Sequence, residues 1–194
     1  MIFRETSLRG AYIVDIEPRA DDRGFFARAF CQREFEQHGL TPVVAQVNMS
    51  STGVAGTIRG LHFQDSSAPE AKFIRCMRGA IHDVIVDLRP ESATYLQHFA
   101  VELSADNHRA LFVPARFAHG LQTLRNNTDV IYHASEFYTP SAEAGLRYDD
   151  PRLEIAWPAD VTVVSEKDRA FPLLEGIEPA LRKRMSAGRQ LEPC

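Results

Sequence analysis

The sequence predicts an all-β fold, a sandwich or a barrel, and two observations indicate it. From residue 72 onward the chain is a series of short segments rich in Val, Ile, Phe and Tyr. Clusters of Gly, Pro, Ser or Asn separate these segments at spacings of roughly ten to fifteen residues, which is typical of all-β proteins. No helical pattern between them is long enough for the crossover of a parallel sheet, so we expect antiparallel strands.

The elements follow in chain order. Residues 10–17 have the composition of a strand and begin after a turn-like Arg-Gly. Residues 31–39 predict one short helix that ends near Gly39, because glycine commonly follows the last helical turn. Residues 176–189, with Pro179 near their start, predict a short basic helix. Further strands are expected at 72–78, 81–88, 98–103, 110–114, 118–124 and 128–138.

The composition is that of an ordinary globular chain. Its 194 residues are 44% hydrophobic and 25% charged, which is enough to bury a substantial core. No repeat or linker divides the sequence, so residues 1–194 are expected to form a single domain. The net charge of −4 argues against a nucleic acid or a membrane surface as partner, because neither attracts an acidic surface.

The sequence also bears on the compartment. It contains no apolar run of about 18 residues that could span a membrane, and the N-terminus lacks the apolar core of a secretory signal. Cys31, Cys76 and Cys194 are odd in number, widely spaced and without a CxxC pair. We therefore expect a cytoplasmic protein without disulfides.

Two of the seven histidines lie beside an arginine in an otherwise apolar segment. His62 belongs to TIRGLHFQ (57–64), together with Arg59, and His119 belongs to PARFAHG (114–120). Such a segment can place a cation and a base in one cavity. Spacing alone leaves each histidine open between a base and a hydrogen-bonded structural residue.

A metal site is a competing hypothesis for the histidines. His62, His82 and His119 could converge from neighbouring strands of a small barrel. However, the sequence has no HxH or HxxxH pair that would place two ligands on one face of a strand or helix. We therefore predict no metal.

Two further segments carry polar groups. Tyr132 and Tyr138 fall on the same face of the strand predicted at 128–138, if no bulge intervenes, and Glu136 shares that face. This face is either a half-buried tyrosine ladder or part of a site. The charged run from Ser165 to Arg169 is either a solvated loop or functional.

Taken together, the motifs resemble those of the dTDP-4-dehydrorhamnose 3,5-epimerase family, over about residues 3–175. The resemblance implies a cupin-like double-stranded β-helix jelly roll with a few short peripheral helices, which works as a homodimer without metal or cofactor. Residues 176–194 lie outside it, as a tail or a helix. The matching motifs are DRGFF (22–26), QVN (46–48), RGLHFQ (59–64), Lys72 with Arg75, GAIHDVIVDLR (79–89), VELSA (101–105), Pro114 with FAHG (117–120), Tyr132, Tyr138, Pro140, DDP (149–151), Trp157-Pro158 and SEKD (165–168).

The resemblance also implies an activity. The substrate would be a nucleoside-diphosphate 4-keto-6-deoxy sugar, and the enzyme would invert C3, C5 or both by removing a proton next to the C4 ketone. The first expectation is conversion of dTDP-4-dehydro-6-deoxyglucose to dTDP-4-dehydro-L-rhamnose. The alternatives are an epimerase of C3 or C5 alone on a dTDP-, CDP- or GDP-linked sugar, a non-catalytic sugar-nucleotide-binding cupin, and a metal-dependent cupin oxygenase or isomerase.

By resemblance, four residues carry the chemistry. His62 is the base, and histidine suits this role because its ordinary pKa is about 6.5. Asp168 orients the ring and stabilises its charged form, Tyr132 is the acid, and Lys72 stabilises the enolate at O4. The resemblance assigns substrate binding to Arg23, Phe26, Gln46, Asn48, Arg59, His119, Tyr138, Glu143 and Lys167.

Three positions depart from the family pattern. Arg28 stands where glutamate is usual, Val47 replaces the aspartate of a Gln-Asp-Asn triplet, and Met49 replaces a histidine. Glutamate can accept a hydrogen bond from the thymine imide, whereas arginine only donates. Arg28 therefore either favours a base rich in acceptors, such as cytosine, or pairs with a carboxylate or a phosphate.

Overall fold

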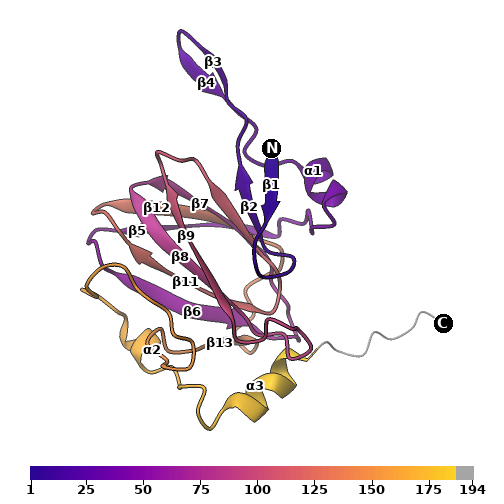
Figure 1. Cartoon of the computed structure of the whole chain (residues 1–194), viewed down its shortest axis with the longest axis vertical. Coiled ribbons are helices and arrows are strands. Elements are labelled where there is room, and N and C mark those ends of the chain that lie inside the picture. The colour runs from indigo at the N-terminus through magenta and orange to yellow at the C-terminus, as the bar shows by residue number, and fades with distance from the viewer. Residues whose placement is uncertain (187–194) are drawn as a thin grey trace, which may run out of the picture.

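The computed structural model describes residues 1–186, and its body is two antiparallel sheets packed face to face (Figure 1). This confirms the predicted all-β class and its sandwich form. The larger sheet contains, in order, β1 (Ile2–Glu5), β2 (Tyr12–Asp15), β10 (Ala110–Val113), β7 (Lys72–Arg78), β12 (Thr128–Ala134) and β5 (Gln46–Thr52). The smaller sheet contains β13 (Glu143–Gly145), β6 (Ile58–Gln64), β11 (Phe117–Thr123), β8 (Ala80–Asp87) and β9 (His98–Ser104).

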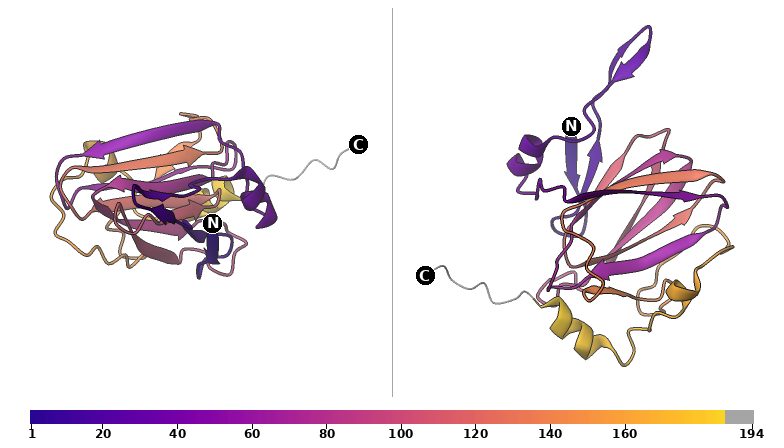
Figure 2. Two further views of the ribbon diagram at one scale, coloured as in Figure 1. Left: turned by 90° about the horizontal axis from the view of Figure 1, so that it is seen from above. Right: turned by 180° about the vertical axis from the view of Figure 1, so that it is seen from behind.

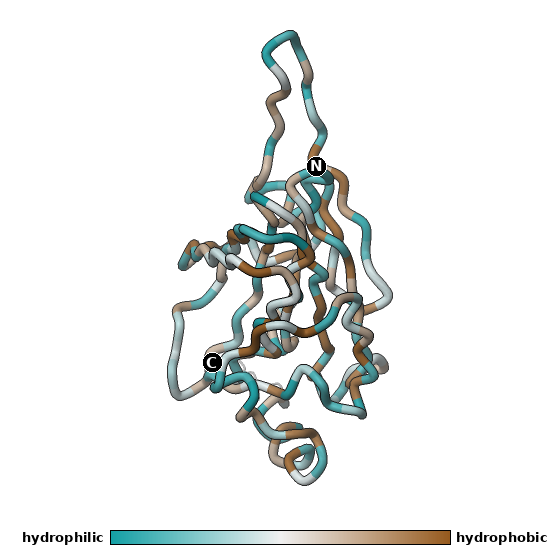
Figure 3. Tube along the Cα trace, turned by 90° about the vertical axis from the view of Figure 1, so that its left-hand side faces the viewer, coloured by the Kyte–Doolittle hydropathy of each residue, from teal (hydrophilic) through white to brown (hydrophobic). Residues whose placement is uncertain are grey.

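A separate hairpin projects away from the sandwich (Figures 1 and 2). It consists of β3 (Arg19–Asp21) and β4 (Gly24–Phe26), which pair with each other and with neither main sheet. Its tip is hydrophilic, as the teal turn in Figure 3 shows. Among residues 1–186 the hairpin contributes no residue to the buried clusters, and Phe25 contacts His108 of the body.

Three short helices lie at the periphery, as expected: α1 (Gln32–Gln37), α2 (Glu166–Arg169) and α3 (Glu178–Met185). The helix predicted near 31–39 is confirmed as α1. Gly39 follows it with φ +69°, and its N–H donates to the Glu36 carbonyl. Pro179 lies in the first turn of α3, which ends at Met185, so the predicted residues 187–189 lie outside the described part of the chain.

Successive side chains of a strand point to opposite faces of the sheet, and the inward-pointing apolar ones form the core between the two sheets. On β7, Ile74 and Cys76 face inward and join buried residues of the other sheet, such as Ile85 and Leu121. A second buried cluster covers the outer face of the smaller sheet, where Leu181 and Met185 of α3 pack. The site cavity described below lies between the two sheets, and α3 packs on the far side of the smaller sheet.

The strand predicted at 128–138 is shorter in the structure. β12 ends at Ala134, because Ser135 turns away: its N–H donates to the Ala71 carbonyl and its hydroxyl accepts from the Ala71 N–H. Tyr138 therefore does not share a strand with Tyr132, and the predicted tyrosine ladder is wrong beyond Ala134.

Strands β5 and β6 were not predicted. Alternate positions of β5, including Gln46, Asn48 and Ser50, are polar although they point inward, because they line a cavity rather than the core. β6 contains an irregularity that breaks the two-residue pattern. No helix in residues 1–186 is long and apolar enough to cross a membrane. The cytoplasmic setting and the single domain stay predictions.

Candidate active site

Strand β6 contains one more residue than the stretch of β11 with which it pairs. His62 lies opposite His119, whereas Arg59 lies opposite Leu121. Three steps along β6 therefore match two steps along β11, which defines a β-bulge. Side chains three positions apart point to opposite faces of a regular strand. The bulge turns Arg59 and His62 toward the same cavity.

Two facing glycines make this bulge possible. Gly60 has φ +133°, and a Cβ at this position would lie 2.5 Å from the Cα of Gly120. A Cβ at Gly120 would in turn lie 3.0 Å from the carbonyl oxygen of Arg59. The backbones of β6 and β11 thus approach more closely than two residues with side chains allow.

Asp168 reaches the cavity from α2. The segment before this helix runs beside β6, where the Ile58 N–H donates to the Val163 carbonyl at 2.9 Å. Ser165 then caps α2, because its hydroxyl accepts a hydrogen bond of 3.0 Å from the Asp168 N–H. The charged run that begins at Ser165 is therefore a helix start that delivers a carboxylate, rather than a solvated loop.

The carboxylate of Asp168 makes two contacts with β6. Oδ1 lies 2.8 Å from His62 Nε2, and Oδ2 accepts from the Gly60 N–H at 3.1 Å. Burial alone would raise the pKa of Asp168, but the hydrogen bonds from His62 and Gly60 outweigh it and hold that pKa below its ordinary value. An ionised Asp168 fixes the hydrogen of the ring on Nε2, which leaves Nδ1 as the basic nitrogen.

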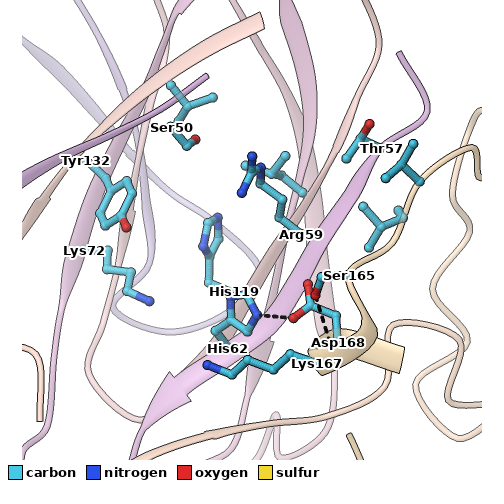
Figure 4. Close-up of a pocket in the computed structure, with 14 residues that line it drawn as sticks. Ser50, Thr57, Arg59, His62, Lys72, His119, Tyr132, Ser165, Lys167 and Asp168 are labelled. Carbon is cyan, nitrogen blue, oxygen red and sulfur yellow. Dashed lines mark hydrogen bonds and ion pairs between the residues drawn. The ribbon is translucent and has the colours of Figure 1, made fainter. Parts of the chain in front are cut away.

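His62 opens onto a cavity of about 430 Å³ between the sheets. In Figure 4, Tyr132 and Lys72 lie on one side of this space and the His62–Asp168 pair lies on the other. Its polar lining consists of Ser50, Thr57, Arg59, His62, Lys72, His119, Tyr132, Ser165, Lys167 and Asp168.

A second cavity of about 230 Å³ adjoins the first. Its lining includes Gln46, Asn48, Gln64, Glu70, Tyr138 and Glu143. His62, Lys72 and Tyr132 line both spaces. The three residues predicted to act as base, cation and acid thus stand where the two cavities meet.

Tyr132 enters the cavity from β12, opposite Asn48 of β5. Burial raises the pKa of Tyr132 above that of a free phenol, and the negative charge of Glu70 raises it further, whereas Arg59 acts in the opposite direction. The phenol is therefore protonated at neutral pH and can donate a proton.

A second histidine–aspartate pair lies beside the first. His119 Nε2 is 2.7 Å from Oδ1 of Asp83, whose side chain is fully buried on β8. Because β11 pairs with both β6 and β8, His119 lies between His62 and Asp83. Asp83 thus fixes the ring of His119 toward the cavity.

Five predicted binding residues meet where the smaller cavity borders the larger one: four line the smaller cavity and Lys167 lines the larger. The Tyr138 N–H donates to Gln46 Oε1 at 2.7 Å, and the Tyr138 hydroxyl donates to Glu143 Oε2 at 2.8 Å. Lys167 Nζ lies 2.7 Å from Glu143 Oε1. The Tyr138 ring is 57% exposed, and Asn48 completes the set from β5. An exposed ring beside a lysine is suited to a base and a phosphate.

Arg23 and Phe26 do not join this site. Both lie on the β3–β4 hairpin, where Arg23 pairs with Asp21 and the Phe26 side chain is 76% exposed. Neither lines the two cavities of its own chain. The other predicted site residues all line one or both of the two cavities.

The convergence of His62, His82 and His119 is wrong. His82 belongs to β8, where the Asp83 side chain points toward His119, so His82 points to the opposite face and contacts Trp157. Among residues 1–186, no group of three or more His, Cys, Asp or Glu side chains is arranged to hold a metal ion.

Two residues of the site had been given no role from the sequence. Asp83 holds His119, and Glu70 lies in the cavity wall 3.3 Å from Lys72. A signal for Glu70 exists, because it stands only two positions before Lys72 in the sequence. Asp83 could be assigned to His119 only once the pairing of β8 with β11 was known.

Comparison with known proteins places the chain in a family. The family model for dTDP-4-dehydrorhamnose 3,5-epimerase matches residues 5–176. The chain belongs to this family. A dTDP-4-dehydrorhamnose 3,5-epimerase of Methanothermobacter thermautotrophicus is 42% identical over 177 residues, which cover 89% of this chain and 95% of the relative.

Solved members of the epimerase family share the fold. The enzyme of Bacillus anthracis, with TDP and PPi bound, is 43% identical with a TM-score of 0.86 and covers 89% of this chain and 99% of its own. The enzyme of Legionella pneumophila, in complex with dTDP-4-keto-L-rhamnose, is 34% identical with a TM-score of 0.86 and covers 93% and 96%. The predicted cupin-like fold is therefore confirmed.

The three departures from the epimerase pattern lie outside the two cavities at His62, and Arg28 lines a separate pocket with Phe26. Arg28 Nη1 donates to Glu34 Oε1 at 2.9 Å, so this arginine pairs with a carboxylate of its own chain. Val47 and Met49 point outward on β5 and are exposed. In this chain none of the three lines the space beside His62.

Proposed function

We propose that this chain inverts C3 and C5 of dTDP-4-dehydro-6-deoxyglucose and so forms dTDP-4-dehydro-L-rhamnose. The observation that carries the proposal is the pair His62–Asp168, at 2.8 Å, facing Tyr132 and Lys72 across one cavity. Membership of the epimerase family supports the reaction class.

His62 is the base in this proposal. Its Nδ1 removes the proton from the carbon next to the C4 ketone, and the electron pair of that C–H bond passes to O4 as an enolate. The imidazolium that forms is stabilised by the ionised Asp168. A positioned base of this kind contributes about 10²–10⁴-fold to the rate.

Lys72 and Tyr132 complete the inversion. The ammonium of Lys72 stabilises the negative charge on O4, and this is expected to be the largest contribution in a space sheltered from water. Tyr132 then donates its proton to the same carbon from the face opposite His62. The ketone reforms and the carbon has the inverted configuration.

The two cavities suggest where the substrate lies. The sugar would occupy the meeting point of the cavities, beside His62, Lys72 and Tyr132. Arg59 and His119 would bind its hydroxyls or the diphosphate. Tyr138, Gln46, Asn48, Glu143 and Lys167 would bind the nucleotide at the rim.

A homodimer is part of the proposal. Arg23 and Phe26 match nucleotide-binding positions of the family, yet they project on a hairpin away from their own cavities. Phe25 is also half exposed, at 50%. Adjacent exposed aromatic side chains are typical of a contact surface. We expect the hairpin to reach the nucleotide rim of a second copy.

Mixing two inactive variants tests this arrangement. His62→Asn removes the base, and Arg23→Ala with Phe26→Ala removes the hairpin contacts. In a mixed dimer, the intact hairpin of the first variant would serve the intact base of the second. Restored activity on mixing is expected, whereas no restoration from dimers that do exchange would contradict the shared site.

Solvent deuterium incorporation into dTDP-4-dehydro-6-deoxyglucose, followed by NMR, tests the reaction itself. The wild type should incorporate deuterium at C3 and C5. His62→Asn should abolish exchange, and Tyr132→Phe should retain exchange without completing inversion. Exchange at both carbons in His62→Asn would rule out His62 as the base.

The same spectra separate the alternatives. Label at one carbon only would indicate a single-site epimerase, and binding without any exchange would indicate a non-catalytic sugar-nucleotide protein. Elemental analysis tests the metal-dependent alternative. Stoichiometric metal, with activity lost on chelation, would overturn the mechanism proposed above.

A further inference from the structure

Glu70 is a carboxylate of the cavity wall that the chemistry above does not use. It lies at the end of the connection between β6 and β7, two positions before Lys72. Its Oε2 is 3.3 Å from Lys72 Nζ. The Glu70 side chain is 11% exposed and that of Lys72 is 14% exposed, so the pair is largely shielded from water.

The surroundings of this pair are those of the reacting centre. Glu70 lines the smaller cavity together with His62, Lys72 and Tyr132. A carboxylate is costly to bury unless a positive group compensates it. Lys72 supplies that compensation, and Glu70 in turn restricts the ammonium of a long and flexible side chain.

Lys72 and Tyr132, the two residues that Glu70 influences, both have a role in the proposed reaction. Lys72 must meet O4 as a cation, and Tyr132 must keep its proton until the enolate is ready to receive it. The carboxylate of Glu70 lies 3.3 Å from the ammonium of Lys72, and its negative charge opposes ionisation of the Tyr132 phenol. One carboxylate therefore acts on the cation and on the acid.

We propose that Glu70 is a positioning residue that holds Lys72 against O4 and places a negative charge in the cavity wall that it shares with Tyr132. The inference rests on the proposed function, because it assigns Glu70 to the ketone side of that reaction. Glu70 acts through Lys72 and Tyr132 and is not itself a proton donor to the sugar.

Other charged groups also face Tyr132, and their influence must be kept constant in a test. Arg59 is the one that opposes Glu70 most directly, because it lowers the pKa of the phenol. The other residues with charged or basic side chains that line the two cavities are His62, Lys72, His119, Glu143, Lys167 and Asp168. A change at Glu70 alone leaves all of them in place.

Glu70→Gln tests the role in turnover, because it keeps the shape and removes the charge. We expect kcat to fall about tenfold with little change in KM, less than the about 10²–10⁴-fold contribution of a positioned acid. The alkaline limb of the kcat profile should move to lower pH. Glu70→Asp should recover part of the rate. Glu102→Gln, an exposed charge removal on β9, is the matched control and should leave kcat unchanged.

Titration of Tyr132 gives a readout that needs no substrate. The chain has five tyrosines, so the tyrosinate absorbance of Tyr132 is isolated by subtracting the same titration of Tyr132→Phe. In Glu70→Gln, with the double variant as its reference, the phenol should ionise at lower pH than in the wild type. Near-UV circular dichroism confirms that the variants are folded.

The outcomes separate the two proposals. If the wild type shows no deuterium exchange, the proposed function fails whatever Glu70 does. If the wild type exchanges but Glu70→Gln has the same kcat and the same alkaline limb, the role of Glu70 fails. An unchanged Tyr132 titration would also overturn it.

Discussion

His62 Nε2 and Asp168 Oδ1 are joined at 2.8 Å although 106 positions separate the two residues. The other oxygen of the same carboxylate accepts from the Gly60 N–H, on the strand that carries His62. The backbone of β6 therefore sets the angle at which Asp168 meets the ring.

Asp168→Asn should inactivate the base by reversing its tautomer. The Gly60 N–H needs an acceptor, so the amide oxygen of the asparagine would face it and the amide NH₂ would face His62 Nε2. Nε2 must then accept, which places the hydrogen on Nδ1. We expect kcat to fall by about 10²–10⁴-fold, and NMR of the imidazole nitrogens should report the reversed tautomer. Unchanged kcat would contradict this role.

Gly60→Ala should damage both stability and activity. The added Cβ would lie 2.5 Å from Gly120 Cα at φ +133°, so we expect a loss of about 2–4 kcal/mol in the free energy of unfolding. Gly53→Ala is the matched control, because its Cβ would meet no atom within 4 Å and its φ is not positive. Urea denaturation measures both. If Gly60→Ala and Gly53→Ala were equally stable, β6 and β11 would be able to move apart at the bulge, and the prediction would be wrong.

Asp87→Asn should cost stability in a manner that depends on pH. The fully buried Asp87 side chain accepts hydrogen bonds from Arg89, Ser92 and Thr94. Burial would raise its pKa, but these bonds outweigh burial and hold the pKa below its ordinary value. The folded chain thus binds this proton more weakly than the unfolded chain. The stabilisation is complete above the ordinary carboxylate range and is lost as the pH falls through the lower folded-state pKa.

We therefore expect Asp87→Asn to lower the free energy of unfolding by about 3 kcal/mol at pH 7. The difference from the wild type should shrink below about pH 4. Asp106→Asn, at a side chain 70% exposed, is the control and should change stability by less than about 1 kcal/mol. Denaturant titrations at several pH values measure this; a difference independent of pH would contradict it.

Leu181→Ala tests whether α3 is an integral part of the fold. This helix lies beyond residues 5–176, where the family model ends. Leu181 is only 4% exposed in the cluster on the outer face of the smaller sheet. We expect a loss of about 2–4 kcal/mol in thermal or urea unfolding. The exposed Lys183→Ala should change stability by about 0.5 kcal/mol or less. If Leu181→Ala and Lys183→Ala changed stability equally little, α3 would not contribute to the stability of the fold.

The nucleotide preference follows from the contact of Arg28. Because its guanidinium already donates to Glu34 at 2.9 Å, we expect dTDP to bind more tightly than CDP or GDP. Arg28→Ala should keep that order. Calorimetric titration with the three nucleotides measures it. Preference for CDP that disappears in Arg28→Ala would mean that Arg28 reads the base after all.

The sequence predicted the regular parts of the fold well. Segment 72–78 was predicted from its strand-forming residues and is strand β7, whose Ile74 and Cys76 belong to the core between the sheets. Strands β5 and β6, which also line the site, were missed because their patterns are irregular. Inward positions on β5 are polar, since they face a cavity, and the bulge in β6 interrupts the two-residue period.

The site itself could be predicted only in part. The order of the family motifs predicted His62, Tyr132, Lys72 and Asp168 as one catalytic set. Spacing alone did not decide whether His62 is a base or a structural residue. Local periodicity cannot report that α2 lies beside β6, or that Asp83 meets His119 across two strands. The place of the hairpin was also hidden: β3 and β4 project from the body, and Arg23 and Phe26 do not line the cavities of the other predicted residues.

The long separation between the base and its carboxylate partner has a consequence for biosynthesis. A ribosome makes β6 early and α2 late, so a nascent chain carries the histidine for most of its synthesis without the group that fixes its tautomer. The proposed His62–Asp168 pair can therefore form only after α2 has been made and has docked beside β6. A truncated product that stops before Ser165 would lack this pair entirely.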